Sequence, residues 1–597
     1  MKSSRTLLLL FLVFSTLLAL KSVYYLPYMA DDALITLRYA QRLLDGFGLT
    51  WTEGIPVEGY SNLLWTLLIA AVGKFGFELL TVARVLGVIF GILNVYLIID
   101  YVSKRFQNAI PILLITLFFY TMSGTVSIWS MAGLEQPLVA FLSLWAVVKY
   151  FDFRDFEKNS SLWYSSLALG LLCITRPDGV ILSVVIGIYH QIANKSNLKV
   201  AIANVLKLAV FPIILYFGQL LFRIYFYGEL VPNTALVKVT PSFFHALSGL
   251  KYNLKFIYSI STLFIPFAIF AVLLIRNNNK RINLLLSILT VWFFYLVFVG
   301  GDIFMAFRHH FYSIVFIILV LAEGLNELLE SNYYKRKKKL FQLLFAVSGL
   351  IFLYQQFEYI YYEDIETFTW TSNQKTLALE LKATFEKEQP LIAVDAAGSL
   401  PYWTMFPSLD MLGLNDYYIA RHKPNNMGGG YIGHELGDPE YTLDQKPDII
   451  QLHFGQREPI QYIDSQLVIN KRFINDYRDI NVFATAGDSH DYSGVLWFNL
   501  YSDKVGIRSV GNKVIIPAYY FKTTEEVFNE FKDGNLLLPI KPNQEFELLL
   551  PYRIQINTIY TEPVGVEILY SSEGKNTRIT IKNNSSKKKY LKEVVVE

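Results

Sequence analysis

The stretch PYMADDALITLRYA, residues 27–40, interrupts a membrane-like sequence with two adjacent carboxylates. The residues before it are apolar enough to lie in a bilayer. Asp31 and Asp32 follow directly after that apolar segment. On a helix over residues 31–45 the apolar side chains gather on one face, and charged ones such as Arg38 gather on the other. We therefore predict a helix that lies on the membrane surface, apolar side down, and begins with a carboxylate pair.

The composition is that of a membrane protein. The 597 residues are 53% hydrophobic and have a mean hydropathy of +0.35, which is too apolar for a soluble chain of this length. The single cysteine, Cys173, excludes a disulfide framework and a cysteine-based metal site. Residues 1–28 resemble a signal peptide, but the many apolar segments that follow favour a retained first helix. The sequence contains no phosphate-binding loop and no feature that indicates a nucleic-acid partner.

Apolar runs predict about eleven transmembrane helices, at about 20 residues each. The run 61–77 is also apolar, but we expect it to lie at the membrane surface or to dip into the membrane, because counting it as a full span would reverse every later loop. The predicted spans lie near residues 6–26, 85–103, 109–126, 134–150, 161–175, 179–193, 201–224, 256–275, 282–300, 311–329 and 340–357.

The charges in the loops predict the orientation of these spans. Alternate loops are rich in lysine and arginine, for example residues 335–339, and the positive-inside rule places them in the cytoplasm. The other loops, including the first one at 27–84, carry carboxylates together with isolated arginines. We therefore predict a multi-pass protein of the cell membrane with a cytoplasmic N-terminus and functional charged groups at its outer face.

The chain changes character after residue 357, which divides it into three predicted regions. Residues 1–357 form the transmembrane module. Residues 358–480 form an extracytoplasmic α/β subdomain, in which LIAVDAAG (391–398) and KPDIIQLHF (446–454) are typical of buried strands. Residues 481–597 contain alternating runs such as NKVIIPAYYF and RITIKN, separated by Asn, Gly and Ser turns, and are predicted to be rich in β-structure.

The residues alone leave two interpretations of Asp31 and Asp32. A carboxylate at the start of a helix accepts free backbone N–H groups and interacts favourably with the helix dipole, which explains one aspartate. Two in succession at the mouth of a multi-span bundle also fit a catalytic role for at least one of them, because carboxylates can act as general acids or bases.

Several short motifs, in their order along the chain, resemble the GT-C class of membrane glycosyltransferases. They resemble more closely the bacterial branch that includes the terminal arabinofuranosyltransferases of mycobacterial cell walls. The resemblance extends to about residue 450, and the Tyr-, Phe-, Lys- and Asn-rich composition departs from the mycobacterial members, so their sugar is not carried over. The motifs are MADDALITLRYAQRLLDGFGLTW (29–51), VEGYSNLLWTLL (57–68), AGLEQPL (132–138), TRPDG (175–179), YGELVPNTALVK (227–238), GGDIFMAFRHH (300–310), VDAAG (394–398), LDMLGLNDYYIAR (409–421) and GHELGDPEY (433–441).

The resemblance implies a GT-C-like fold in a bacterial cell membrane and a polyprenyl-phosphate sugar as donor substrate, with membrane lipid and a glycan acceptor as partners. The acidic position of the family matches Asp31, which implies Asp31 as general base and Asp32 as the residue that orients acceptor or donor. Arg176 and Arg308 are placed to bind the donor phosphate. No cofactor is implied, although a divalent cation beside the two aspartates is compatible with the sequence.

Further candidates in the outer loops each have a structural alternative. Glu58 and Tyr60 either bind sugar hydroxyls or belong to an interfacial turn. Glu135 is either functional or a favourable charge at a helix start. Glu229 and Asn233 either bind substrate or supply ordinary turn chemistry.

The densest polar cluster in the sequence contains Asp302, Arg308 and His309. We expect it to bind the donor phosphate, with snorkelling of long side chains toward the interface as the alternative. We expect no metal site there, because adjacent histidine side chains diverge on a helix and no third ligand is suitably spaced. In the outer region, His434 and Glu435 either face the acceptor or make structural hydrogen bonds.

These patterns favour a hexosyl- or pentosyltransferase that moves a sugar from a polyprenyl-phosphate donor to a cell-envelope glycan or another acceptor at the outer face of the membrane. The alternative is a polytopic transporter or flippase of lipid-linked saccharide. A transporter would favour ionisable residues at mid-span and related halves with broken helices, and neither stands out in the sequence.

Overall fold

The computed structural model consists of two compact units, which we describe separately. Unit 1 comprises Met1–Thr50 and Glu58–Phe368, and unit 2 comprises Trp51–Val57 and Thr369–Glu597. A short piece of the first loop therefore folds with the C-terminal part of the chain. The structure describes residues 4–194, 197–238, 242–277, 279–362, 365–424, 433–485, 491–554, 556, 558–562 and 566–597.

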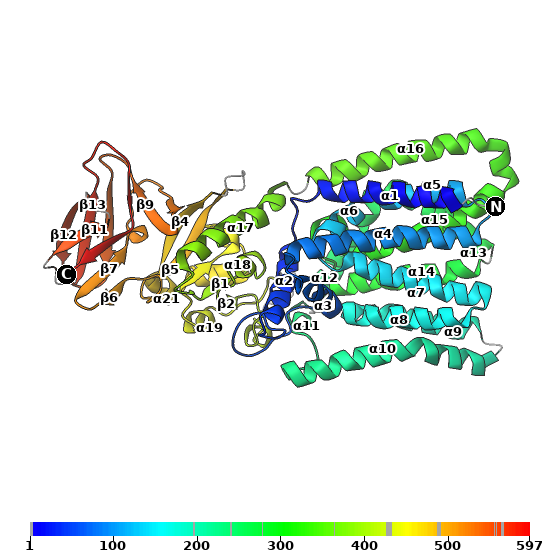
Figure 1. Ribbon diagram of the computed structural model, residues 1–597, viewed down its shortest axis with the longest axis horizontal. Coiled ribbons are helices and arrows are strands. Elements are labelled where there is room, and N and C mark those ends of the chain that lie inside the picture. Colours follow the sequence, from blue (N-terminus) through cyan, green and yellow to red (C-terminus); the bar gives the residue numbers. More distant parts are fainter. Residues whose placement is uncertain are drawn as a thin grey trace. The chain divides into compact units, whose positions relative to one another are not determined.

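Unit 1 is a bundle of helices. Figure 1 shows α1, α4, α7, α8 and α10 running along the bundle, with α2 and α3 at one end of them. The helices are α1 (Ser4–Tyr24), α2 (Asp31–Leu44), α3 (Leu63–Gly73), α4 (Leu79–Arg105), α5 (Ala109–Thr121), α6 (Gly124–Met131), α7 (Gln136–Phe156), α8 (Asn159–Thr175), α9 (Val180–Ala193), α10 (Leu198–Tyr227), α11 (Asn233–Lys238), α12 (Phe243–Ser259), α13 (Ser261–Arg276), α14 (Lys280–Val299), α15 (Phe311–Glu330) and α16 (Asn332–Tyr362).

Every predicted span is helical, but the predicted number of eleven is not confirmed. Among the described residues, six helices are long and apolar enough to cross a membrane, or up to eight if each bent pair counts as one span. The predicted single spans at 109–126 and 256–275 are wrong in shape. Each consists of two helices, α5 with α6 and α12 with α13, which meet at angles of 56° and 96°.

The expected surface helix α2 exists, but its predicted exposed polar face is wrong. Nine of its 14 residues are buried, and they include Arg38, which is 0% exposed. Arg42 is also buried and donates from Nε to the hydroxyl of Thr50 at 3.0 Å. The helix packs against α3 and α4, so protein rather than solvent covers its two arginines. The run 61–77 forms the short helix α3 of 11 residues, which confirms that it is no full span.

Unit 2 contains a mixed α/β sheet followed by smaller antiparallel sheets, as predicted for the region after the spans. Its elements are α17 (Ile365–Phe385, the first turn of which belongs to unit 1), β1 (Ile392–Val394), α18 (Ser399–Thr404), β2 (Ser408–Asp410), α19 (Pro439–Asp444), β3 (Ile449–Gln451), α20 (Tyr462–Leu467), α21 (Lys471–Asp476), β4 (Tyr477–Ala484), β5 (Tyr492–Asn499), β6 (Arg508–Val510), β7 (Lys513–Pro517), β8 (Asn529–Lys532), β9 (Asn535–Ile540), β10 (Glu545–Leu550), β11 (Ile559–Glu562), β12 (Glu567–Glu573), β13 (Asn576–Lys582), β14 (Lys589–Leu591) and β15 (Glu593–Val596).

The largest sheet has eight strands in the order β14-β9-β8-β4-β5-β3-β1-β2. Strand β1 lies between β2 and β3 and runs parallel to both, and all three are fully buried. The two apolar stretches predicted as buried strands are thus β1 and β3. Two smaller sheets follow, in the orders β10-β13-β12 and β11-β15-β7-β6. Thr52, from the first loop, joins this unit by accepting a hydrogen bond from the backbone N–H of Ser408 at 3.2 Å.

A tight turn follows β3 and depends on a glycine. His453, Phe454 and Gly455 all have positive φ values, of 24°, 55° and 87°. A Cβ atom added to Gly455 would lie 1.8 Å from the hydroxyl oxygen of Tyr492, which itself donates to the carbonyl of Phe454. The glycine is therefore required by both the backbone conformation and the space available.

We predict that Gly455→Ala destabilises the α/β part of unit 2 by about 2–4 kcal/mol, the sum of a left-handed alanine and an overpacked contact. Gly511→Ala is the matched control, because Gly511 also has a positive φ of 60° but has no atom within 4 Å of the added Cβ. The control should cost only about 1 kcal/mol. Hydrogen exchange of the full-length protein, followed at β3 and β5 for Gly455→Ala and at β6 and β7 for Gly511→Ala, measures both. Equal protection in the two variants would contradict the proposed clash.

Candidate functional site

The candidate site begins where α2 starts. Ala30 is the N-cap residue of α2 and has no side-chain cap, so Asp31 and Asp32 occupy the first turn rather than the cap position. Their negative charges lie at the positive end of the helix dipole, which favours them there. The first turn of α2 thus presents the two carboxylates at one end of the bundle.

A second segment reaches this site from the turn between α14 and α15. Within it, Ala306 and Phe307 adopt left-handed backbone conformations, with φ values of 53° and 52°. Such conformations are costly for residues other than glycine and require support from their surroundings. Trp129 supplies some of it by donating from Nε1 to the carbonyl of Ala306 at 3.2 Å, and Trp292 donates likewise to the carbonyl of His309 at 3.0 Å. This turn presents Arg308 to α2.

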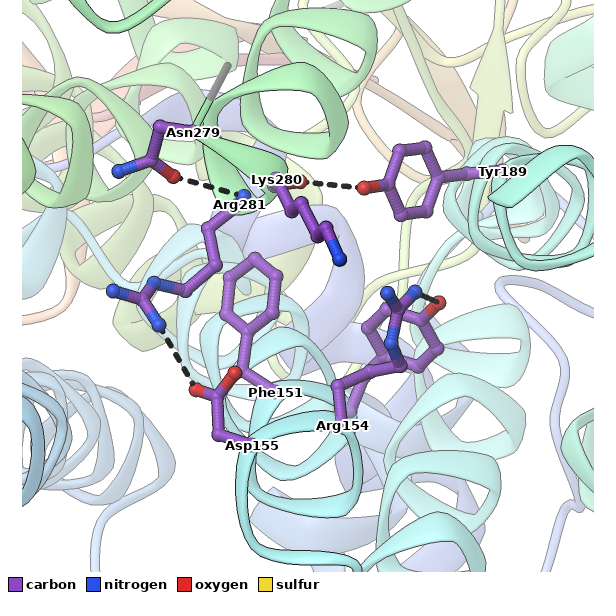
Figure 2. Close-up of a pocket in the computed structure, with 8 residues that line it drawn as sticks. Phe151, Arg154, Asp155, Tyr189, Asn279, Lys280 and Arg281 are labelled. Atoms are coloured by element: carbon purple, nitrogen blue, oxygen red, sulfur yellow. Dashed lines mark hydrogen bonds and ion pairs between the residues drawn. The ribbon is translucent and has the colours of Figure 1, made fainter. Parts of the chain in front are cut away.

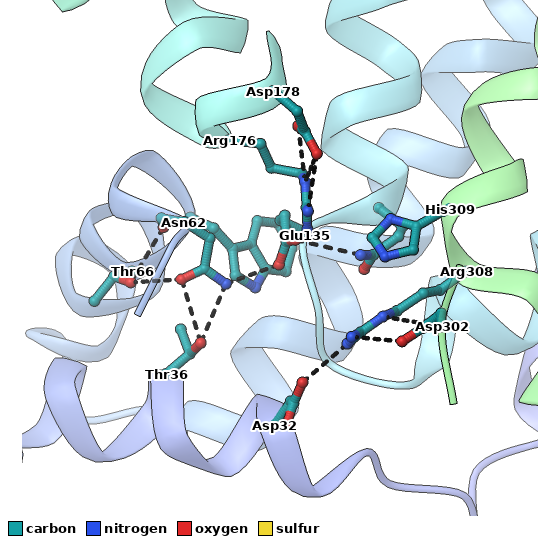
Figure 3. Close-up of polar contacts among 12 residues, drawn as sticks. Asp32, Thr36, Asn62, Thr66, Glu135, Arg176, Asp178, Asp302, Arg308 and His309 are labelled. Carbon is teal, nitrogen blue, oxygen red and sulfur yellow. Dashed lines mark hydrogen bonds and ion pairs between the residues drawn. The ribbon is translucent and has the colours of Figure 1, made fainter. Parts of the chain in front are cut away.

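Arg308 joins the two segments through ion pairs, which Figure 3 shows. Its Nη1 lies 3.0 Å from Oδ2 of Asp32. Its Nη2 and Nε lie 2.9 Å and 2.6 Å from the two carboxylate oxygens of Asp302. The Asp302 side chain is 6% exposed, whereas that of Asp32 is 25% exposed. Asp302 is therefore the buried anchor of Arg308, and Asp32 is the partner that solvent and substrate can reach.

A second arginine cluster lies beside the first (Figure 3). Arg176 contacts both oxygens of Asp178, with Nε to Oδ1 and Nη2 to Oδ2 each at 3.0 Å. Its Nη1 donates to Glu135 at 2.7 Å. The other oxygen of Glu135 accepts from Nδ2 of Asn62 at 2.7 Å. Thr36 of α2 is hydrogen-bonded to Asn62, so this network also reaches the helix that carries the aspartates.

The combined clusters contain more carboxylates than guanidinium groups. Asp32 and Asp302 flank Arg308, and Glu135 and Asp178 flank Arg176. The charges of Arg176 and Glu135 also act on Arg308. An anionic ligand that enters such a site must therefore take the place of a carboxylate on an arginine. Within the described part of the chain, no group of three His, Cys, Asp or Glu side chains is arranged to hold a metal ion.

Sequence reasoning missed two members of these clusters as site residues. Asp178, in the TRPDG motif, pairs with Arg176 and also accepts from the hydroxyl of Tyr295 at 3.1 Å. Asn62 gave no signal beyond its place in the VEGYSN motif. Its role depends on Glu135, which lies 73 residues away in the sequence. Only the three-dimensional packing of α3 near the start of α7 brings the two together.

The candidates of the first loop form a separate cluster with the end of α10. Arg223 makes an ion pair with Glu58 through Nε and a second contact from Nη2 at 3.1 Å. The backbone N–H of Asn233 donates to the carbonyl of Glu58 at 3.0 Å. Tyr227 donates to the hydroxyl of Tyr60 at 3.3 Å. These contacts fix the loop after α10, where Glu229 is partly buried, against the first loop.

Burial raises the pKa of Glu58, and its pairing with Arg223 opposes that effect. The ion pair joins the first loop to the end of α10.

His434 and Glu435 lie in unit 2, and we describe their surroundings there. Glu435 is buried and His434 is partly buried. His434 lies near enough to His453 to affect it electrostatically, and burial together with His434 lowers the pKa of His453 to about 4. The backbone N–H of His453 donates to Oδ2 of Asp395 at 2.9 Å. Asp395 and His453 follow the parallel strands β1 and β3, at the edge where α/β sheets commonly bind ligands.

Asp395 is paired with a second buried carboxyl group, that of Asp464. Burial, and then the neighbouring Asp464, raise the pKa of Asp395 well above its usual range. The side chains are 5% and 0% exposed, and each has one carboxyl oxygen with no hydrogen-bond partner among the described residues. The pair is thus stable when it holds a proton. Its stabilising contribution is complete below the unfolded pKa, about 4, and is lost as the pH rises through the folded pKa.

We predict that Asp395→Asn makes unit 2 more stable than the wild type at pH 7, because asparagine replaces the protonated carboxyl group without an ionisation cost. The gain should be present at neutral pH and should vanish near pH 4, where the carboxyl group is protonated in the unfolded chain as well. Hydrogen exchange at β1 and β3 in full-length protein, measured at both pH values, tests this. The variant would be less protected than the wild type at pH 7 if the pair were ionised and well solvated.

Two comparisons with known sequences give results. A domain of unknown function, DUF8728, matches residues 362–501. A terminal β-(1→2)-arabinofuranosyltransferase from Mycobacterium tuberculosis is 28% identical over 224 residues. That alignment covers 35% of this chain and 35% of the relative, so the match spans about a third of the length of that curated protein.

Among solved structures, the fold is similar to that of ArnT from Cupriavidus metallidurans. The apo structure of ArnT superimposes with a TM-score of 0.52 at 10% identity and covers 83% of this chain and 99% of ArnT. A structure of ArnT bound to undecaprenyl phosphate gives a TM-score of 0.48 at 11% identity and covers 67% of this chain and 85% of that one. The chain therefore has the fold of the GT-C membrane glycosyltransferases and is similar in sequence to a mycobacterial terminal arabinofuranosyltransferase.

Proposed function

We propose that this protein transfers a sugar from a polyprenyl-phosphate donor to a cell-envelope glycan or another acceptor at the outer face of a bacterial cell membrane. The observation that carries the proposal is Arg308, held by the buried Asp302 and bonded to the more exposed Asp32 of α2. The fold that the chain shares with ArnT supports it, since ArnT binds undecaprenyl phosphate, a lipid of the proposed donor class.

The donor phosphate binds Arg308 by exchange with a carboxylate. Arg308 contacts Asp302 through two nitrogens and Asp32 through one, so the Asp32 contact is the easier one to replace. A phosphate oxygen that takes the place of Asp32 on Nη1 forms a charge-assisted hydrogen bond of the same kind. Arg308 then keeps two anionic partners, Asp302 and the phosphate, and the carboxylate of Asp32 is released to the part of the site that solvent reaches. The ring of Phe304 lies 4.3 Å from the guanidinium carbon and limits its movement.

Asp31 is the general base in this proposal. Asp31 matches the acidic position of the family that the chain resembles, which supports it as the base, and Asp32 is bonded to Arg308. The acceptor hydroxyl gives its proton to Asp31 while its oxygen bonds to the anomeric carbon of the sugar. The bond from that carbon to the phosphate oxygen breaks, and its electron pair stays on the polyprenyl phosphate, which Arg308 stabilises.

The remaining candidates supply positioning and the acceptor side. Arg176, held by Glu135 and Asp178, keeps the second cluster rigid and adds positive charge near the phosphate. His309 lies on the same turn as Arg308 and faces this region (Figure 3). His434 and Glu435 are proposed to contact the acceptor from unit 2. The proposed orientation places the N-terminus in the cytoplasm and unit 2 outside the cell.

Mass spectrometry of the envelope glycans from a strain that lacks this protein tests the reaction class. We predict that one glycan loses a fixed sugar mass and that the wild-type protein restores it, whereas Asp31→Asn does not, at matched membrane levels. The missing mass identifies a pentose or a hexose. Unchanged glycans together with accumulation of a lipid-linked saccharide would instead favour the flippase alternative.

Kinetics with purified protein in nanodiscs separate the two aspartates. With the donor identified by the missing mass, we predict that Asp31→Asn lowers kcat by about 100-fold or more, because general base catalysis is lost. Asp32→Asn should change the KM for the donor more than kcat, because Asp32 competes with phosphate for Arg308. Asp45→Asn on the same helix is the control, since Asp45 lies at the opposite end of α2. Equal kcat losses for Asp31→Asn and Asp32→Asn would contradict this division of roles.

A further inference from the structure

A pocket lies at the end of the bundle opposite to the Asp32 cluster. Its walls come from the end of α7, from α9 and from the start of α14, and its volume is about 360 Å³. Helix α7 begins next to Glu135 of the candidate site and ends at this pocket, and α14 begins at the pocket and ends just before Asp302. The pocket and the candidate site are therefore separated by the length of a spanning helix.

Three cations line this pocket, and Figure 2 shows them. Arg281 is compensated, because its Nε pairs with Glu323 at 2.6 Å and its Nη1 with Asp155 at 3.3 Å. Arg154 donates from Nη1 to the hydroxyl of Tyr150 at 3.3 Å, which carries no charge. Among the residues that the structure describes, neither Arg154 nor Lys280 has a carboxylate within ion-pair distance.

The negative charge near the pocket is already used by other cations. Asp155 also pairs with Nε of Arg105 at 2.9 Å. Glu323 also accepts from Asn279 at 3.1 Å and from the hydroxyl of Tyr101. Those carboxylates are therefore not available to Arg154, which is partly buried, or to Lys280, which is exposed, so both positive charges can interact with an anion that enters the pocket.

The remaining walls suit an anion that is attached to an apolar group. The N-terminus of α14, a helix of 20 residues, lies at Lys280 and adds positive potential. Phe151 and Tyr189 supply aromatic surface, and the hydroxyl of Tyr189 is fixed by donating to the carbonyl of Lys280 at 2.5 Å. On α9, Ile188 and Ile192 beside Tyr189 are more than half exposed, as expected for a surface that faces lipid.

We propose that this pocket binds the phosphate group of an anionic membrane lipid through Arg154 and Lys280. Basic pockets between spanning helices are known to hold lipid phosphates. The same contacts also fit a free phosphate ion, so phosphate recognition is the shared chemistry. If the protein has the orientation given above, the pocket lies in the cytoplasmic leaflet. The inference does not depend on the transfer reaction, because it concerns binding at the other end of the bundle.

Native mass spectrometry of the delipidated full-length protein tests the proposed lipid binding. Phosphatidylglycerol is the anionic probe, and phosphatidylcholine, which has no net charge, is the control lipid. We expect one phosphatidylglycerol to bind more tightly than the rest. Arg154→Gln with Lys280→Gln should weaken that binding about tenfold or more, because two charge-assisted contacts are lost. The charge-matched control is Lys158→Gln with Lys199→Gln, since both lysines are exposed at the same end and do not line the pocket.

The outcomes distinguish specific lipid binding in the pocket from non-specific attraction to the basic residues at this end of the bundle. Loss of the tight lipid in the pocket variant alone supports the proposal. Equal weakening in the pocket variant and the control, or no weakening in either, overturns it, because basic residues at this end would then attract lipid only non-specifically. The charge-retaining variant Arg154→Lys with Lys280→Arg should keep most of the binding and shows that any loss is not a failure to fold.

A further arm distinguishes the two sources of phosphate. Inorganic phosphate at millimolar concentration is added to the lipid-bound protein and to the delipidated protein. If the pocket recognises lipid, the lipid stays bound and phosphate alone does not raise the Tm. If it recognises free phosphate, phosphate displaces the lipid and raises the Tm of the wild type but not of the pocket variant. Either result supports phosphate recognition, whereas a Tm shift that the pocket variant retains contradicts it.

Discussion

The pairing of two buried arginines with carboxylates determines how the end of the bundle is built. A charge near hydrocarbon is tolerated only with partners, so Arg308 and Arg176 require acidic groups from other segments. Arg308 takes Asp32 from α2 and Asp302 from the turn after α14. Arg176 takes Asp178 from its own turn and Glu135 from the start of α7. Four distant parts of the sequence meet because of these two residues, and the remaining helices align to permit it.

The sequence was sufficient to locate the helices and most residues of the candidate site. Apolar runs identify spans because bilayer length and backbone hydrogen bonding leave few alternatives. Arg176, Arg308 and Asp32 were found because charges at span ends are costly. The periodicity of α2 predicted its existence but not its surroundings, since a polar face covered by protein has the same pattern as one covered by water. Arg38 is therefore buried where exposure was expected. The bends of 56° and 96° were missed because an apolar run shows that a segment can lie in a membrane but not where its helix axis changes direction.

Unit 2 shows a different limit of sequence reasoning. Strands β1 and β3 were recognisable as short apolar runs, but the proximity of Asp395 to Asp464 was not, because α18, β2, α19 and β3 all lie between them in the sequence. Their pairing depends on parallel strands that end at one edge of a sheet. At this edge of the sheet, unit 2 has a carboxyl pair that is most stable when protonated and a strained turn at His453. Both result from the topology of the chain rather than from a local motif.

The assignment of Trp51–Val57 to unit 2 has a consequence for how the protein can be divided. The chain passes between the two units at three places, after Thr50, after Val57 and after Phe368. Unit 2 is therefore not a module appended to the end of a membrane protein, and removing everything after Phe368 would leave Thr52 without its partner Ser408. Glu58, the next residue after that loop, is tied to Arg223. A gene that gained or lost unit 2 in a single step would have had to remake the first loop as well, so the two parts are expected to have been inherited together.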